Sequence, residues 1–190
     1  VMNSVQGTAT AKISESTVYV TGALAVTADN SIALDATVKN GLSTDQAGGA
    51  ILVAINSVGY TPTDLFNATW DTLAGTSGTN PQADGAVAEV TGSNLTAGSV
   101  AVTATNASRL NALITSDVGA AASSEIMAAG GTAASGVMAS NSLAGKARAT
   151  VDLLGGKTVT ATAGGMTVEA HDETHLTSRT LLVTSATASG

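Results

Sequence analysis

Two histidines four residues apart are the part of this sequence closest in type and spacing to a metal site. They lie in the segment His171-Asp172-Glu173-Thr174-His175. On a helix, two histidines at this spacing can share one zinc ion. The glutamate does not follow the first histidine, as it does in metalloproteases, and the flanking residues have the pattern of strand and turn. We therefore expect a polar turn here, with neither a metal nor a cofactor.

The second candidate for chemistry is a group of aromatic residues. The chain has one Trp, one Phe and two Tyr, and Tyr60, Phe66 and Trp70 all lie within one stretch of 25 residues, 60–84. Aromatic side chains are enriched among the residues that dominate protein–protein binding energy. These three residues are the candidate partner-binding site, through contact with another subunit or a host molecule.

A short helix is expected to carry this group. Thr61-Pro62-Thr63-Asp64 has the residue types of a helix start, and Gly75 those of a stop. A helix over 62–74 gathers its apolar residues on one side, and a polar loop then continues to 84. Packing of that side against the rest of the chain accounts for the same residues without a partner, because an amphipathic helix must bury its apolar face.

The rest of the sequence is built on a phrase that occurs three times. It appears at 3–7 (Asn-Ser-Val-Gln-Gly), 56–59 (Asn-Ser-Val-Gly) and 141–145 (Asn-Ser-Leu-Ala-Gly). Alternating segments match at 8–13, 85–90 and 146–151, and a further block matches at 23–28, 99–104 and 165–170. Such self-similarity predicts stacked repeats that bury their apolar faces against one another. We divide the single segment 1–190 into units of about 3–55, 56–140 and 141–190, with 60–84 inserted in the second.

Composition favours a narrow interior built from small side chains. Hydrophobic residues make up 44%, mostly Ala and Val, and aromatic residues only 2%. The net charge is −7, and the seven basic residues are scattered, which argues against nucleic-acid binding. Cysteine is absent, which excludes disulfides and thiolate metal sites. No apolar run is long enough for a membrane-spanning helix.

Period-2 alternation predicts many short strands. They fall at 8–13, 17–20, 24–28, 32–38, 51–58, 86–90, 100–105, 109–114, 136–140, 147–153, 158–162, 166–170, 175–180 and 182–185. The segment 120–139 is assigned to strand by its place in the repeat. Positive φ is expected at the turn glycines, which are Gly22, Gly98, Gly155, Gly156, Gly164 and Gly165. At 20 to 30 residues per coil, about seven coils follow; a β-sandwich is the alternative.

These blocks resemble the repeats of very large bacterial surface proteins of the haemagglutinin and leukotoxin-like adhesin type. The resemblance covers most of the chain outside 60–84. It implies an all-β fold, a right-handed parallel β-helix (β-solenoid) with one short inserted helix, in an exported or cell-surface fibre. We expect a non-enzymatic stalk, adhesin or filament, cut from a larger protein. Its partners would be copies of itself, neighbouring repeats, or a host-surface or glycan ligand.

An enzyme is the alternative. Parallel β-helices also carry polysaccharide lyases and hydrolases, which need carboxylates paired on one face. The acids of this chain, such as Asp29, Asp35 and Asp152, are dispersed singly.

Overall fold

The computed structural model describes residues 1–44, 50–60, 84–122 and 135–188. This part of the chain forms strands joined by turns and contains no helix. The strands are β1 (Met2–Val5), β2 (Thr8–Ser14), β3 (Thr17–Tyr19), β4 (Ala23–Thr44), β5 (Ala50–Val58), β6 (Asp84–Thr91), β7 (Asn94–Ala97), β8 (Ser99–Ala122), β9 (Ser135–Leu143), β10 (Gly145–Asp152), β11 (Val159–Ala161) and β12 (Met166–Ala188). Since the described residues contain no helix, none of them forms a helical membrane span.

The strands form four parallel sheets of three strands each. Sheet A has the order β1-β5-β9, sheet B β10-β6-β2, sheet C β11-β7-β3 and sheet D β12-β8-β4. The chain therefore visits A, B, C and D in the same order three times, as β1–β4, β5–β8 and β9–β12. We call each visit to all four sheets a pass. This all-β, parallel arrangement is compatible with the β-helix expected from the sequence.

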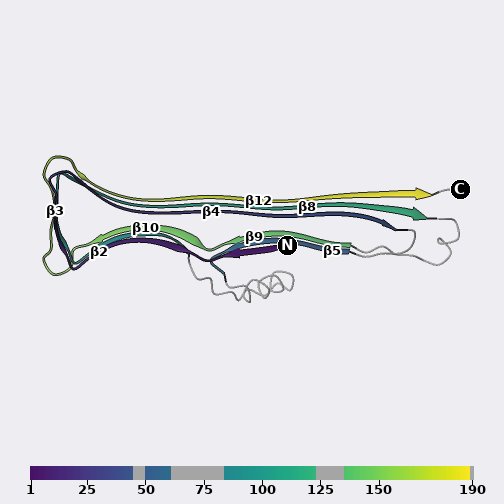
Figure 1. Ribbon diagram of the computed structural model, residues 1–190, viewed down its shortest axis with the longest axis horizontal. Coiled ribbons are helices and arrows are strands. Elements are labelled where there is room, and N and C mark those ends of the chain that lie inside the picture. The colour runs from purple at the N-terminus through teal and green to yellow at the C-terminus, as the bar shows by residue number, and fades with distance from the viewer. Residues whose placement is uncertain (45–49, 61–83, 123–134, 189–190) are drawn as a thin grey trace.

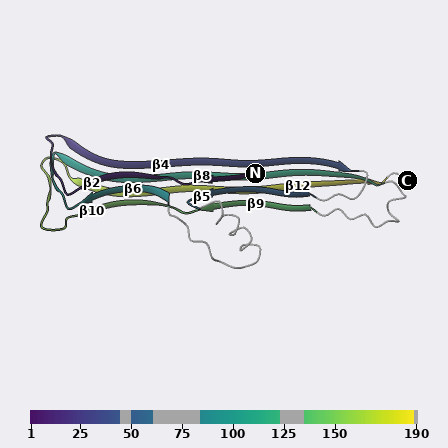
Figure 2. The ribbon, with the colours of Figure 1, turned by 60° about the horizontal axis from the view of Figure 1, so that its bottom comes forward.

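The sheets form two long layers joined at one end. In Figure 1, sheet D runs the length of the molecule, sheets A and B follow one another along the opposite layer, and the short sheet C connects the layers. Figure 2 shows the strands of successive passes lying side by side along this length. Side chains that point inward from sheets A, B and C thus meet those of sheet D.

The pairing register reproduces the alignment of the repeated phrases. Asn3 pairs with Asn56, and Asn56 with Asn141. In the alternating segments, Thr8 and Lys146 both pair with Gly85, and in the third block Ala23 pairs with Ser99. Each repeat of the sequence therefore places equivalent side chains in one column that crosses all three passes.

Small and β-branched residues fill the interior. The largest cluster of buried residues lies between sheets B, C and D and includes Ala88, Val90, Leu95 and Val102. Two smaller clusters lie between sheets A and D, one around Ala54 and Ile114, the other formed by Ile32, Val58 and Leu110 with neighbours. A layer built from these side chains is thin, which explains why the chain needs so few aromatic residues.

Several expectations about the strands need correction. Each sheet contains three strands where seven coils were expected, because equivalent residues of successive passes are 53 and 85 residues apart rather than about 20 to 30. The separate strands predicted at 24–28 and 32–38 are one continuous strand, β4, and the same merging forms β8 and β12. Strands β1 and β7 were not predicted. The inserted helix at 62–74 lies outside the described residues, as does the central part, 123–134, of the segment 120–139.

The turn glycines also differ from expectation. Gly155 and Gly156 have φ of 73° and 75°, as predicted, but Gly22, Gly98, Gly164 and Gly165 do not have positive φ. A Cβ on Gly98 would lie 3.0 Å from the Thr21 carbonyl oxygen, and one on Gly164 would lie 2.8 Å from Ser99 Cβ. At these two corners a side chain would crowd the neighbouring pass, more severely at Gly164 than at Gly98.

Candidate interaction surface

A ladder of asparagines links the three passes inside the molecule. Asn3 Nδ2 donates to Asn56 Oδ1 at 3.0 Å, and Asn56 Nδ2 donates to Asn141 Oδ1 at 3.0 Å. The first residue of each repeated phrase is thus the rung of a hydrogen-bonded column. The bonds all run in one direction, from Asn3 to Asn141, and at the end of the column Asn141 Nδ2 donates to Ser178 Oγ at 3.0 Å in place of a further asparagine.

The same amides also connect sheet A to sheet D. Their Nδ2 atoms donate to the carbonyl oxygens of Asp35 (2.8 Å, from Asn3), Asn111 (2.7 Å, from Asn56) and Thr177 (2.6 Å, from Asn141). Asn56 is fully buried, so its amide replaces the water that these polar groups would otherwise bind. The ladder therefore stabilises both the stack of passes and the contact between the two layers.

A second ladder lies within sheet D and ends differently. Asn30 Nδ2 donates to Asn106 Oδ1 at 2.9 Å, and Asn106 Nδ2 donates to Asp172 Oδ1 at 3.1 Å. The third rung is a carboxylate, which also accepts a hydrogen bond from Thr174 Oγ1 at 3.1 Å. A carboxylate accepts hydrogen bonds but donates none, so this ladder has no donor for a further rung.

On the outer face, charges form one small network. Glu89 lies between Lys12 (Nζ–Oε1 3.6 Å) and Arg148 (Nη2–Oε2 3.5 Å), one residue from each neighbouring pass. The Thr91 hydroxyl donates to Glu89 Oε1 at 2.6 Å. This hydrogen bond, followed by the two positive charges, lowers the pKa of Glu89 against the opposing effect of desolvation.

The two end passes differ in how much apolar surface they expose. Val168 and Leu176 of β12 are 41% and 50% exposed, while their column neighbours Val102 and Leu110 in β8 are buried. On the opposite edge of sheet D, Val26 of β4 is buried. Among the described residues, half-exposed inward-facing apolar side chains therefore lie chiefly on the third pass, where the 23-residue strand β12 is the outer strand of sheet D.

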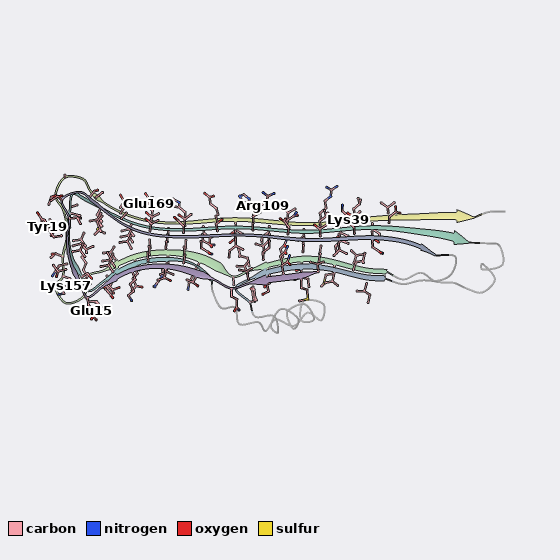
Figure 3. The ribbon with its side chains drawn as sticks, in the orientation of Figure 1. Glu15, Tyr19, Lys39, Arg109, Lys157 and Glu169 are labelled. Atoms are coloured by element: carbon pink, nitrogen blue, oxygen red, sulfur yellow. The ribbon has the colours of Figure 1, made fainter. Side chains whose placement is uncertain are left out.

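Of the predicted aromatic group, the structure describes Tyr60 alone. Tyr60 is partly buried and its carbonyl oxygen accepts a hydrogen bond from Ser4 Oγ at 3.1 Å. Phe66 and Trp70 lie outside the described residues, so the structure does not test whether the three side chains meet. The most exposed aromatic residue in the described part is Tyr19, 74% exposed on sheet C (Figure 3).

The two histidines lie on the outer face of β12, not in a turn, which corrects that part of the prediction. His171 Nε2 lies 3.4 Å from Glu169 Oε2. Figure 3 shows Glu169 of β12, Arg109 of β8 and Lys39 of β4 pointing away from the other layer. Among the described residues, no three His, Asp or Glu side chains are grouped closely enough to hold a metal ion.

Sequence reasoning missed the second ladder, although a signal for it was present. In each unit the block ending at 28, 104 or 170 is followed two residues later by Asn30, Asn106 or Asp172. The recurrence of an amide at one place in the repeat, with an acid in its third copy, would have predicted a polar column.

Comparison with known proteins yields no relative for this chain. No family model, curated protein or solved structure matches it. Function must therefore be argued from the columns, ladders and edges described above.

Proposed function

We propose that this chain is a β-solenoid segment, a right-handed parallel β-helix that serves as a structural and adhesive part of a bacterial cell-surface or extracellular fibre. The observation that carries the proposal is the threefold path through four sheets with equivalent residues in register. Right-handedness follows from the strong preference of parallel crossover connections for that hand. The resemblance to adhesin repeats agrees with this architecture.

Such a segment contributes stiffness to a longer stack of passes. Backbone hydrogen bonds run along the stack in four sheets, and the Asn3–Asn56–Asn141 ladder couples opposite layers at every pass. A force along the stack is shared among many parallel bonds, so a rod of this kind resists bending. The role that follows is that of a stalk or filament that holds interaction surface away from a cell.

The outer faces and the insertion would supply the contacts. Tyr60, Phe66 and Trp70 are the proposed partner-binding residues, with a host-surface or glycan ligand or another fibre segment as the partner. Substitution of Trp70 by Ala tests this role when binding to a glycan array and to the chain itself is measured. Unchanged binding in a folded variant would assign the aromatic residues to packing alone.

The architecture and the function can be tested together on the native material. Electron microscopy and fibre diffraction are expected to show unbranched rods with an axial spacing of about 4.8 Å between successive passes. Compact particles without that spacing would overturn the proposal. Incubation with acidic and neutral polysaccharides would reveal an enzyme through the release of reducing ends.

A further inference from the structure

The two ends of the stack are matched to one another along most of sheet D. One column of this sheet contains Leu34, Leu110 and Leu176, and another contains Val26, Val102 and Val168. If the same register continues into a second molecule, Leu176 lies beside Leu34 of the second copy and Val168 beside its Val26. The half-exposed side chains of β12 would then become buried, as their neighbours in β8 already are.

The other sheets continue in the same way. Asn141 Nδ2 donates to the Thr177 carbonyl and to Ser178 Oγ within its own molecule. On association it would exchange Ser178 for Oδ1 of Asn3 in the second copy, just as Asn56 Nδ2 donates to Asn141 Oδ1 in the next pass. In sheet B, the inward residues Ala149 and Val151 would lie beside Ala11 and Ile13. Lys12 of the second copy would share a column with Thr150 and lie diagonally between a like charge, Arg148, and an opposite charge, Asp152.

One position in sheet D is mismatched. Asp172 would lie beside Asn30 of the second copy, whose Nδ2 already donates to Asn106. The Asn30 oxygen would face the Asp172 carboxylate, two acceptors with no hydrogen between them. A polar pair left without a hydrogen bond in an interior is unfavourable.

We infer that the third pass of one molecule binds the first pass of a second copy, head to tail and in continuous register, and that Asp172 weakens this contact. The inference rests on the proposed function and specifies its self-association: β9, β10, β11 and β12 receive β1, β2, β3 and β4. Edge strands with unpaired backbone groups are ready-made templates for such pairing. An acid inside the contact restrains growth, as charges do on many natural sheet edges.

Cross-linking tests the register, because the chain has no cysteine of its own. One variant carries Ala33→Cys and another His175→Cys; both sites are exposed on the outer face and share a column with Arg109. A mixture of the two is expected to give a disulfide-linked or short bismaleimide-linked dimer. Each variant alone should give none.

The matched control replaces His175→Cys by Thr167→Cys on the same strand. Thr167 shares a column with Ala25 rather than Ala33, which displaces the thiol by about 26 Å at the usual rise per residue. Equal cross-linking of this control, or dimers of His175→Cys with itself, would overturn the head-to-tail register. The second result would indicate a symmetric contact between two third passes.

Substitution of Asp172 tests whether this residue weakens the contact between two copies. Asp172→Asn supplies an Nδ2 for Asn30 of the second copy and is expected to raise the association constant about fivefold to tenfold in sedimentation equilibrium. Glu173→Gln removes the same charge from the neighbouring outer position and is expected to change association less than twofold. Equal effects of the two substitutions, or weaker association of Asp172→Asn, would contradict the role of Asp172.

The outcomes separate this inference from the proposed function. The axial spacing of about 4.8 Å arises within one molecule, so it would persist if the molecules did not associate. If the spacing of about 4.8 Å is observed but no cross-links form, head-to-tail binding is refuted and the solenoid is not. The loss of both would refute the solenoid itself.

Discussion

Asn56 donates a hydrogen bond to Asn141 across 3.0 Å, although 85 residues separate them in the chain. Asn56 also receives one from Asn3 and gives one to the Asn111 carbonyl. Three passes and two layers therefore meet at one buried amide, and the beginning of each repeated phrase is the point at which the repeats are bonded together.

Replacement of Asn56 by Ala should destabilise the fold strongly. It removes three hydrogen bonds and leaves buried polar groups on both sides, at a cost of roughly 2–4 kcal/mol in the free energy of unfolding. Urea unfolding followed by circular dichroism measures this loss. Asn111→Ala is the matched control, since only the backbone carbonyl of Asn111 takes part in the ladder, and we expect less than about 0.5 kcal/mol for it. Equal losses would show that the ladder contributes nothing specific.

Leu110 and Leu176 occupy one column of sheet D, but Leu110 is buried and Leu176 is half-exposed. Leu110→Ala creates a cavity in a buried cluster and is expected to cost about 2–5 kcal/mol. Leu176→Ala truncates the same column where the side chain is half-exposed, so its cost should be about 1 kcal/mol in dilute solution. Denaturant titration of both variants at low concentration tests the difference. Similar costs would mean that the third pass is covered in solution.

Gly85 should tolerate no side chain. A Cβ at this position would overlap the Lys146 carbonyl of the next pass, and relief requires a backbone shift in sheet B that costs roughly 1–3 kcal/mol. Gly22→Ala is the control, because a Cβ there meets no atom within 4 Å; its stability should stay within about 0.5 kcal/mol of the original. Melting temperatures of the two variants decide the matter, and a stable Gly85→Ala protein would contradict the close approach of β6 and β10.

Glu89 should make stability depend on pH. Its pKa in the folded protein lies below the ordinary value of 4.5, chiefly because the Thr91 hydroxyl donates to it and then because Lys12 and Arg148 lie nearby. A lowered folded pKa adds stability above the unfolded pKa, and that stability is lost as pH falls through the folded value.

Comparison of wild type with Glu89→Gln isolates this contribution. The difference between their urea midpoints should be constant above about pH 5.5 and shrink as the pH falls below 4.5. Thr91→Val should reduce the difference, because it removes the main cause of the shift. A difference that grows on acidification would contradict a lowered pKa.

Much of the fold could be predicted because the repeated residues share columns. Alignment of the phrases at Asn3, Asn56 and Asn141 predicts the pairing that sheet A has. The expected number of coils was wrong, since about 20 to 30 residues were assigned to each coil whereas equivalent residues of successive passes are 53 and 85 apart. The strand lengths were also wrong, because alternation continues through β4 without a break in the hydrophobic pattern. A period of two identifies the face of a strand but not its length.

The candidate site could be predicted only in part. The structure describes Tyr60 but not Phe66 or Trp70. The segment from His171 to His175 was expected to form a turn leading into a strand at 175–180, although all of it lies on β12. The positions of the ladder residues were visible in the repeats, but their role was not. Asparagine is common at turns, and only its burial between two layers shows that it acts as an interior bond.

The sequence by itself determined which residues stack on which, because equivalent positions in a repeated phrase occupy the same place on successive passes. Only the tertiary structure decided which columns meet across the interior, since that depends on where the corners bend the chain. The Asn56 amide thus reaches the Asn111 carbonyl in sheet D, a contact that no spacing encodes. The same fold leaves Val168 and Leu176 of β12 half-exposed while Val26 of β4 is buried, a difference that the shared column pattern does not contain.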